Sequence, residues 1–219
     1  MILPGSRLNL PLGLLLALLS GCSSVYYNTM EKLGYEKRDL LVDRVEDARA
    51  AQEAAREQFA SALDQFIAAT NFQGGDLEAA YRRLNAAYAA SERRANAVRE
   101  RIDRVEKVAG DLFSEWEDEL ELYTDRNLRR ASARQLEQIR ARYRQLITAM
   151  QRAEQRIDPV LGAFRDRVLH LKHNLNARAI ASLHGDRAEI ESGIQALIRQ
   201  MNASIDEANR FIEEFTPAG

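Results

Sequence analysis

Apolar and small residues recur along most of the chain with alternating gaps of four and three positions. The first such series is Leu41, Val45, Ala48, Gln52, Ala55, Phe59, Ala62 and Phe66. Three further series run from Leu77 to Trp116, from Leu136 to Phe164 and from Ile190 to Phe215. This spacing is typical of helices that pack along one seam. The pattern predicts an all-α protein, an elongated antiparallel bundle of coiled-coil hairpins.

The first break in the pattern is the stretch "NFQGGD" at residues 71–76. Gly74 and Gly75 interrupt a helix there, and Asp76 can cap the next one. A short break between two heptad helices makes an antiparallel hairpin. With the turn centred near residues 73 and 74, Phe59 lies beside Tyr88 and Val45 near Ile102.

Two further breaks complete the predicted set of helices. Ser132 with Gln135 resembles a capping box, which predicts a turn at 124–131; one uninterrupted, kinked helix is the alternative. The stretch "HGD" at 184–186 predicts the last break, and Pro159 with Gly162 should bend the helix before it. Three long helices and a shorter C-terminal one are therefore expected, at about 29–70, 76–124, 132–182 and 187–215.

The chain begins with a segment of a different kind. Residues 8–19, "LNLPLGLLLALL", form an apolar run of twelve residues, and a helix of that length spans about 18 Å. This is short of the roughly 30 Å of a bilayer core but suits a signal peptide. Leu19-Ser20-Gly21-Cys22 resembles the bacterial lipobox, which implies a lipoprotein signal peptide at 1–21, cleavage after Gly21 and acylation of Cys22 by palmitate-like chains. The alternative is a secreted protein with a stray cysteine.

The residue after the cysteine bears on the destination of the protein. Ser23 stands where aspartate retains enteric lipoproteins at the inner membrane. By that resemblance the protein is expected at the periplasmic face of the outer membrane, with the inner membrane as the alternative. Residues 22–219 would then form a single helical domain.

Three stretches of the mature chain are similar to a family of Gram-negative lipoproteins known as domain of unknown function 2959. They are "YYNTMEKLGYEKRDLLVDRVEDARAAQEAAREQF" (26–59), "EWEDEL" (115–120) and "VLGAFRDRVLHLKHNLNARAIASL" (160–183). The resemblance implies a periplasmic, helical lipoprotein and supplies no activity, catalytic residue or cofactor.

Charge and motifs narrow the function further. The formal net charge is -2, which argues against nucleic acid as a partner because phosphate binding needs a clustered basic surface. None of the lysines follows a glycine, so no P-loop is present, and no GxSxG motif occurs. We therefore expect no catalytic residues, no enzyme activity and no cofactor beyond the covalent lipid.

Two places could carry binding chemistry instead. Asp166, His170 and His173 recur at helical spacing and are weak candidates for metal ligands; partly exposed polar residues beside the seam are the simpler explanation. We therefore expect no metal there, and the kinked region 159–183 is either a structural junction or a binding groove. Phe72, at the first turn, either caps Leu77 or projects as a candidate partner contact.

An acidic block at 115–125 is followed by a basic block at 126–144. The two blocks either pair across the hairpin turn or form an exposed docking surface. Taken together, the sequence predicts a membrane-anchored, non-enzymatic scaffold or protein-interaction module of the cell envelope, which binds an envelope protein or a second copy of itself. The alternative is a periplasmic small-molecule, lipid or metal-binding protein that uses region 159–183.

Overall fold

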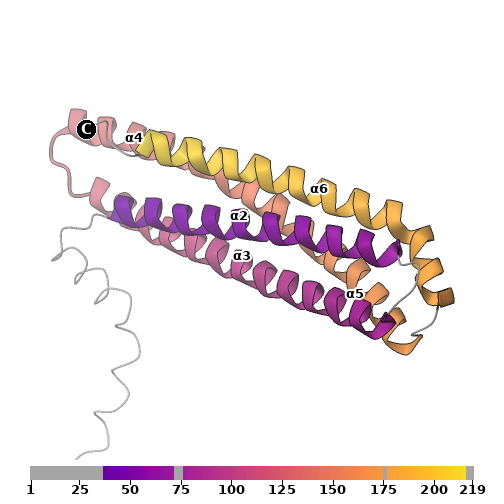
Figure 1. Ribbon diagram of the computed structural model, residues 1–219. Helices are drawn as coiled ribbons and strands as arrows, with labels where there is room; N and C mark the ends of the chain where they lie inside the picture. Colours follow the sequence, from indigo (N-terminus) through magenta and orange to yellow (C-terminus); the bar gives the residue numbers. More distant parts are fainter. Residues whose placement is uncertain (1–36, 72–75, 175–176, 216–219) are drawn as a thin grey trace, which may run out of the picture. The chain divides into compact units, whose positions relative to one another are not determined.

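The computed structural model describes residues 37–71, 76–174 and 177–215, and this part of the chain contains helices and no strand. From Arg38 onward the chain forms one compact unit. The helices are α2 (Lys37–Thr70), α3 (Leu77–Leu120), α4 (Arg126–Gln155), α5 (Ile157–His173) and α6 (Ala177–Phe215) (Figure 1). The all-α prediction is confirmed.

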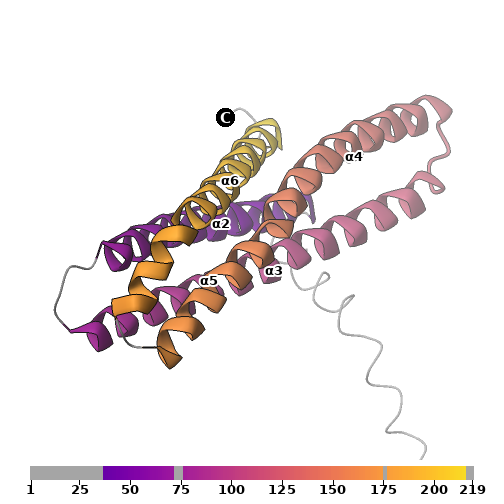
Figure 2. The same ribbon diagram turned by 90° about the vertical axis from the view of Figure 1, so that its right-hand side faces the viewer.

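The helices form a four-membered antiparallel bundle in which α4 and α5 act as one long member (Figure 2). This joined member packs against α3 on one side and against α6 on the other. Hydrogen bonds tie α2 to α6: Arg49 donates to Asn209 at 2.9 Å and Arg56 to Asn202 at 3.1 Å. The middle of α2 therefore lies beside α6.

The predicted seam forms the core of the bundle. Seven apolar members of the first series have no exposed surface: Leu41, Val45, Ala48, Ala55, Phe59, Ala62 and Phe66. Burial of such side chains contributes roughly 1.5–3 kcal/mol each for the larger ones, so the heptad pattern supplies the main stabilisation. The ring of Phe164 on α5 receives Phe66 and Tyr88 edge-on, with centroids 6.2 and 6.0 Å away.

The predicted alignment of the first hairpin is also confirmed. Arg101 on α3 donates to Asp47 on α2 at 3.0 Å, and Gln58 on α2 donates to the carbonyl of Ala87 at 3.5 Å. Residue 47 of α2 thus lies opposite residue 101 of α3, and residue 58 opposite residue 87, which sets Phe59 beside Tyr88. The turn centre inferred from the glycines was therefore placed correctly to within one helical turn.

The second hairpin has a true turn, but the predicted cap is wrong. The helix α3 ends at Leu120 and α4 begins at Arg126, so the uninterrupted helix does not occur. Asp125 is the N-cap, and its Oδ1 accepts the backbone N–H groups of Asn127 and Leu128 at 2.6 and 3.2 Å. Ser132 lies inside α4, where its hydroxyl accepts a hydrogen bond from Trp116 Nε1 at 2.8 Å. The earlier aspartate satisfies the first free N–H groups, so no cap is needed at Ser132.

The bend expected near Pro159 occurs at Arg156, which separates α4 from α5. Proline lacks the N–H group that would bond the carbonyl of Gln155, four residues earlier. The backbone N–H of Arg156 bonds the carbonyl of Ala153 at 3.2 Å, three residues back, as in a tightened helix end. The local chemistry of proline thus accounts for the interruption.

The break predicted at residues 184–186 is wrong. The helix α6 runs without interruption from Ala177 to Phe215, so the C-terminal helix is 39 residues long rather than short. The chain instead turns after α5, where Asn174 is the C-cap and its side-chain amide donates to the carbonyl of His170 at 3.2 Å. Glycine inside a helix costs only about 1 kcal/mol relative to alanine. Leu183 and Ile190, on either side of Gly185, are buried, and their packing outweighs that cost.

Candidate functional site

The lipidation site lies outside the described residues. So do Gly21, at the predicted cleavage point, and Phe72, at the first turn. Among the described residues, none of the helices combines the length and the apolar character needed to cross a membrane. The candidate sites among the described residues therefore lie on the helical bundle.

The acidic and basic blocks pair across the α3–α4 turn. Arg140 on α4 binds Glu117 on α3 at 2.7 Å, and Arg129 pairs with Glu121 nearer the turn. The hydrogen bond from Arg140 holds the pKa of Glu117 below its ordinary value, and the same bond raises the pKa of Arg140. Both groups stay ionised at neutral pH. These pairs help to align the two helices across the turn.

An aromatic layer lies beneath these ion pairs. The guanidinium of Arg140 lies 5.2 Å from the centre of the Phe113 ring, which meets Tyr143 edge-on with centroids 5.3 Å apart. Burial raises the pKa of Tyr143 to about 12, so its phenol stays neutral and does not act as a base. The hairpin is thus fixed by packing as well as by charge.

Beyond this layer the turn exposes apolar side chains. Leu122 is 79% exposed, Leu128 58% and Tyr123 41%. We call these three residues the apolar tip. Leu169 is the one other large hydrophobic residue that is exposed in the described part of the chain. The heptad pattern does not predict the tip, because it describes only the buried seam. The available signal was a group of large apolar residues between Trp116 and Leu136, namely Leu120, Leu122, Tyr123 and Leu128.

A polar groove of about 410 Å³ lies at the same end of the bundle as the tip. It is formed by the start of α2 at Arg38, by α4 at Gln135 and Arg142, and by the end of α6 at Phe215. Arg142 is paired with Glu214 at 3.0 Å. The groove places the first turn of α2, the early turns of α4 and the last turn of α6 together at one end.

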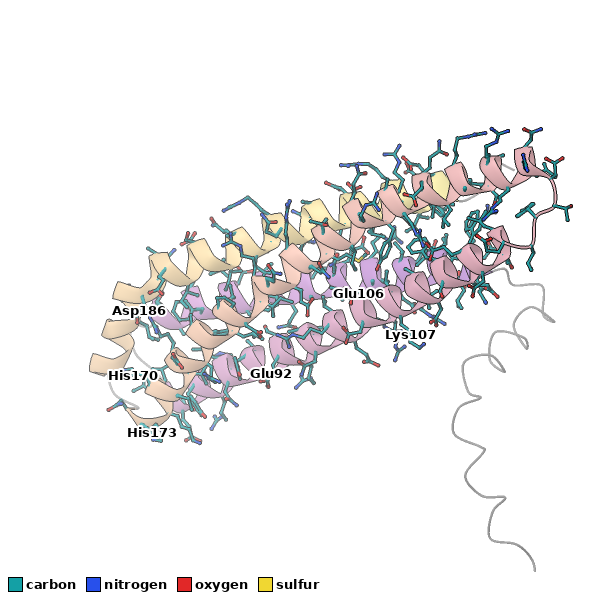
Figure 3. All side chains as sticks on the ribbon, turned by 180° about the vertical axis from the view of Figure 1, so that it is seen from behind. Glu92, Glu106, Lys107, His170, His173 and Asp186 are labelled. Atoms are coloured by element: carbon teal, nitrogen blue, oxygen red, sulfur yellow. The ribbon has the colours of Figure 1, made fainter. Side chains whose placement is uncertain are left out.

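The candidate metal ligands are not brought together. Asp166, His170 and His173 are all exposed on α5, and Asp166 lies 3.8 Å from Arg165 (Figure 3 labels the two histidines). Within the described ranges no three His, Cys, Asp or Glu side chains are grouped so as to hold a metal ion. His184, the first residue of the break predicted at 184–186, lies within α6.

The kinked region holds a small cavity between α5 and α6. Its volume is about 190 Å³, and it is lined by Pro159 and Val160 on one side and by Ile190 and Gly193 on the other. Ligand pockets commonly measure roughly 300–1,000 Å³. Nearby, Arg167 on α5 bridges to Asp186 at 3.0 Å and to Glu189 at 3.4 Å on α6. These ion pairs give the region the character of a structural junction.

One fully buried polar side chain on α2 and one on α6 have polar atoms that form no hydrogen bond in the described structure. Both amide atoms of Gln52 and the hydroxyl of Ser204 are buried without a hydrogen-bond partner in the described structure. Gln52 was predicted in the seam. Ser204 was missed because it falls three residues after Met201, next to the seam position Ile205; a wider apolar stripe on α6 was the available signal.

A second acidic group, on α4, has a shifted pKa. Burial raises the pKa of Glu154 on α4, and Arg99 partly opposes this rise. Arg99 also pairs with Asp158. Glu106, labelled in Figure 3, accepts a hydrogen bond from Gln151 at 2.6 Å. These contacts tie α3 to the α4–α5 member.

Comparison with known proteins adds a family and nothing more specific. The sequence profile of the family described as "Protein of unknown function (DUF2959)" matches residues 26–215. No curated protein and no solved structure matches the chain at a significant level.

Proposed function

The chain belongs to the DUF2959 family, and since that membership supplies no activity, we propose a function from the residues themselves. The protein is a lipid-anchored lipoprotein of the periplasm. Its helical bundle is a non-enzymatic scaffold or interaction module that binds another envelope protein or a second copy of itself.

The observation that carries this proposal is the position of Cys22. It is the single cysteine of the chain, and it directly follows an apolar run and the small residues Ser20 and Gly21. Each buried methylene of an acyl chain contributes about 0.8 kcal/mol, and two chains hold a protein stably at a membrane. Ser23 favours the outer membrane as the destination.

A scaffold role is supported by the way the bundle uses its polar residues. Ion pairs join neighbouring helices at the α3–α4 hairpin, where Arg129 pairs with Glu121 and Arg140 with Glu117, and at the α5–α6 contact, where Arg167 pairs with Asp186. The sequence offers no glycine-lysine pair for a nucleotide phosphate and no nucleophile motif. Long antiparallel helices of 34 to 44 residues, as in α2 and α3, provide an extended surface of about 50 to 65 Å for a partner.

Metabolic labelling with radioactive palmitate tests the anchor. We expect label in the protein, and its complete loss in Cys22→Ala, because the sulfur and the new amino terminus both disappear as acceptors. Ser24→Ala is the matched control and should stay labelled. Label that persists in Cys22→Ala contradicts the proposal.

Separation of the inner and outer membranes by density tests the destination of the protein. Ser23→Asp should move the protein to the inner membrane.

A second candidate function is small-molecule binding in region 159–183. The cavity between α5 and α6 supports it, although its volume of about 190 Å³ suits only a small ligand. Native mass spectrometry of the protein purified under gentle conditions tests it. A copurifying ligand that is lost in Gly193→Leu, which would fill the cavity beside Val160, is the expected result; a protein of unmodified mass in repeated preparations contradicts it.

A further inference from the structure

The apolar tip carries an inference of its own. Three of the four large hydrophobic residues exposed in the described part of the chain fall between positions 122 and 128. We propose that this tip inserts into the headgroup layer of the membrane to which the protein is anchored. The inference rests on the proposed lipid anchor at Cys22 and adds which part of the bundle touches lipid.

The tip is presented by a well-fixed turn. Asp125 caps α4, Arg129 on α4 pairs with Glu121 just after α3, and Trp116 Nε1 donates to Ser132 across the hairpin. None of these contacts involves the side chains of Leu122, Tyr123 or Leu128. Exposure of these side chains is therefore not needed to form the turn, and a group of exposed apolar side chains that the fold does not use is a candidate contact site.

The residue types of the turn suit a lipid surface. Tyrosine is enriched at membrane interfaces, where its ring lies among the headgroups and its hydroxyl faces water. Arginine stems lie along apolar surface while their guanidinium groups reach phosphates. Arg126 and Arg130 lie beside the tip and form no ion pair with a carboxylate within the described ranges; Arg130 bonds the carbonyl of Arg126 and the side chain of Asn127.

The position of the tip fits an anchored bundle. The first turn of α2 lies at the same end of the bundle as the α3–α4 turn (Figure 1), and the groove shared by Arg38, Gln135 and Phe215 also lies there. The bond between Asp47 and Arg101 sets Arg38 opposite about residue 110 of α3. The tip therefore projects about ten residues, or roughly 15 Å, beyond the start of α2.

The length of chain before α2 allows the anchor and the tip to reach one surface. Fifteen residue steps separate Cys22 from Lys37, and a chain of that length spans at most roughly 50 Å. This exceeds the projection of the tip by a wide margin. An acylated Cys22 in the bilayer is therefore compatible with contact between the tip and the same leaflet.

A lipid surface fits the tip better than a protein partner does. Stable protein interfaces bury about 800 Å² on each side, with a packed core of complementary shape. Three side chains on a projecting turn offer no groove and no such area. A bilayer needs no complementary shape and accepts apolar side chains at its interface.

The test uses the chain's lack of other cysteines. Acylation blocks Cys22, so Leu122→Cys introduces a unique free thiol for an environment-sensitive nitrobenzoxadiazole label. Leu169→Cys is the matched control, since Leu169 is an exposed leucine on α5. Each labelled, acylated protein is reconstituted into vesicles of phosphatidylethanolamine and phosphatidylglycerol. We expect a several-fold rise in fluorescence and quenching by nitroxide lipids at position 122, and neither at position 169.

Flotation of the vesicles keeps the two proposals separate. Protein that floats while its label at position 122 remains in water overturns insertion of the tip and leaves the anchor standing. Protein that does not float contradicts the anchor and overturns both. Adding Tyr123→Ser and Leu128→Ser to the labelled Leu122→Cys protein should remove most of the fluorescence rise without changing flotation or helix content; an undiminished rise also overturns the assignment.

Discussion

The two ends of the bundle use apolar side chains differently. Near the α2–α3 turn, Phe66 and Phe164 have no exposed surface and meet edge-on. At the α3–α4 turn, Leu122 is 79% exposed although the helices beneath it are packed through Phe113 and Tyr143. The comparison separates side chains that hold the bundle together from side chains that the fold does not need. Substitutions at the two ends should therefore differ most in their effect on stability.

The largest effect is expected from Phe164→Ala. The substitution removes the ring that receives both Phe66 and Tyr88, and such a cavity typically costs about 3–5 kcal/mol. Urea unfolding followed by circular dichroism measures it. Leu122→Ala at the other end is the matched control and should change the free energy of unfolding by less than about 0.5 kcal/mol. Equal losses in the two variants would contradict the distinction between the ends.

Gln52→Leu should have an intermediate effect of opposite sign. Both amide atoms of Gln52 are buried without a partner, and each unsatisfied buried group costs about 1–3 kcal/mol. We expect the free energy of unfolding to rise by about 1–2 kcal/mol in the same urea experiment. Gln195→Leu, at an exposed position of α6, is the control and should have little effect. A loss of stability in Gln52→Leu would mean that the amide is satisfied by bound water.

Asp125→Ala tests the turn that carries the apolar tip. Its carboxylate accepts two backbone N–H groups at the start of α4, and loss of such a cap costs about 1 kcal/mol. Ser132→Ala, at the position first assigned as a cap, removes only the hydrogen bond from Trp116. Thermal unfolding should show the larger loss for Asp125→Ala. The reverse order would show that the hydrogen bond from Trp116 to Ser132 stabilises the turn more than the cap does.

The smallest effect is expected from Glu154→Gln, and it should depend on pH. Burial raises the folded-state pKa of Glu154 above its unfolded value, so ionisation destabilises the folded protein at neutral pH. The cost is relieved as the pH falls through the folded-state pKa. Glu154→Gln should therefore raise the free energy of unfolding at pH 7, by less than about 1 kcal/mol, and have less effect at pH 4. Thermal unfolding at the two pH values measures this as a small rise in melting temperature at pH 7. A variant that is less stable at pH 7 would show that the contact with Arg99 dominates.

The sequence was sufficient to predict the all-α fold and the alignment of α2 with α3. Heptad spacing identifies the buried face wherever the seam is apolar, as at Val45 and Phe59, and the glycines locate the first turn. The prediction of a turn at residues 184–186 was wrong because the packing of the helix outweighs the low helix propensity of Gly185. A single glycine does not end a helix whose neighbouring positions, Leu183 and Ile190, are buried.

The surface features were harder to predict because they do not follow the seam. The role of Ser132 depends on Trp116, which lies 16 residues earlier in the chain and meets it only across the hairpin. The apolar tip is defined by exposure, which no heptad pattern specifies. The candidate ligands Asp166, His170 and His173 share a helical spacing, but their exposure separates them from the core and from any fourth ligand.

The uninterrupted helix α6 has a consequence for how the protein can be joined to others. Four antiparallel passes bring the chain back to the end at which it started, so Phe215 lies in the groove that also contains Arg38. Any domain or tag attached directly after Phe215 would therefore be joined to the bundle near the first turn of α2. A reporter placed in the α2–α3 turn would be carried at the opposite end, a full helix length away, which is about 50 Å for the 34 residues of α2. Labels at these two attachment points would therefore report a known distance along the bundle axis.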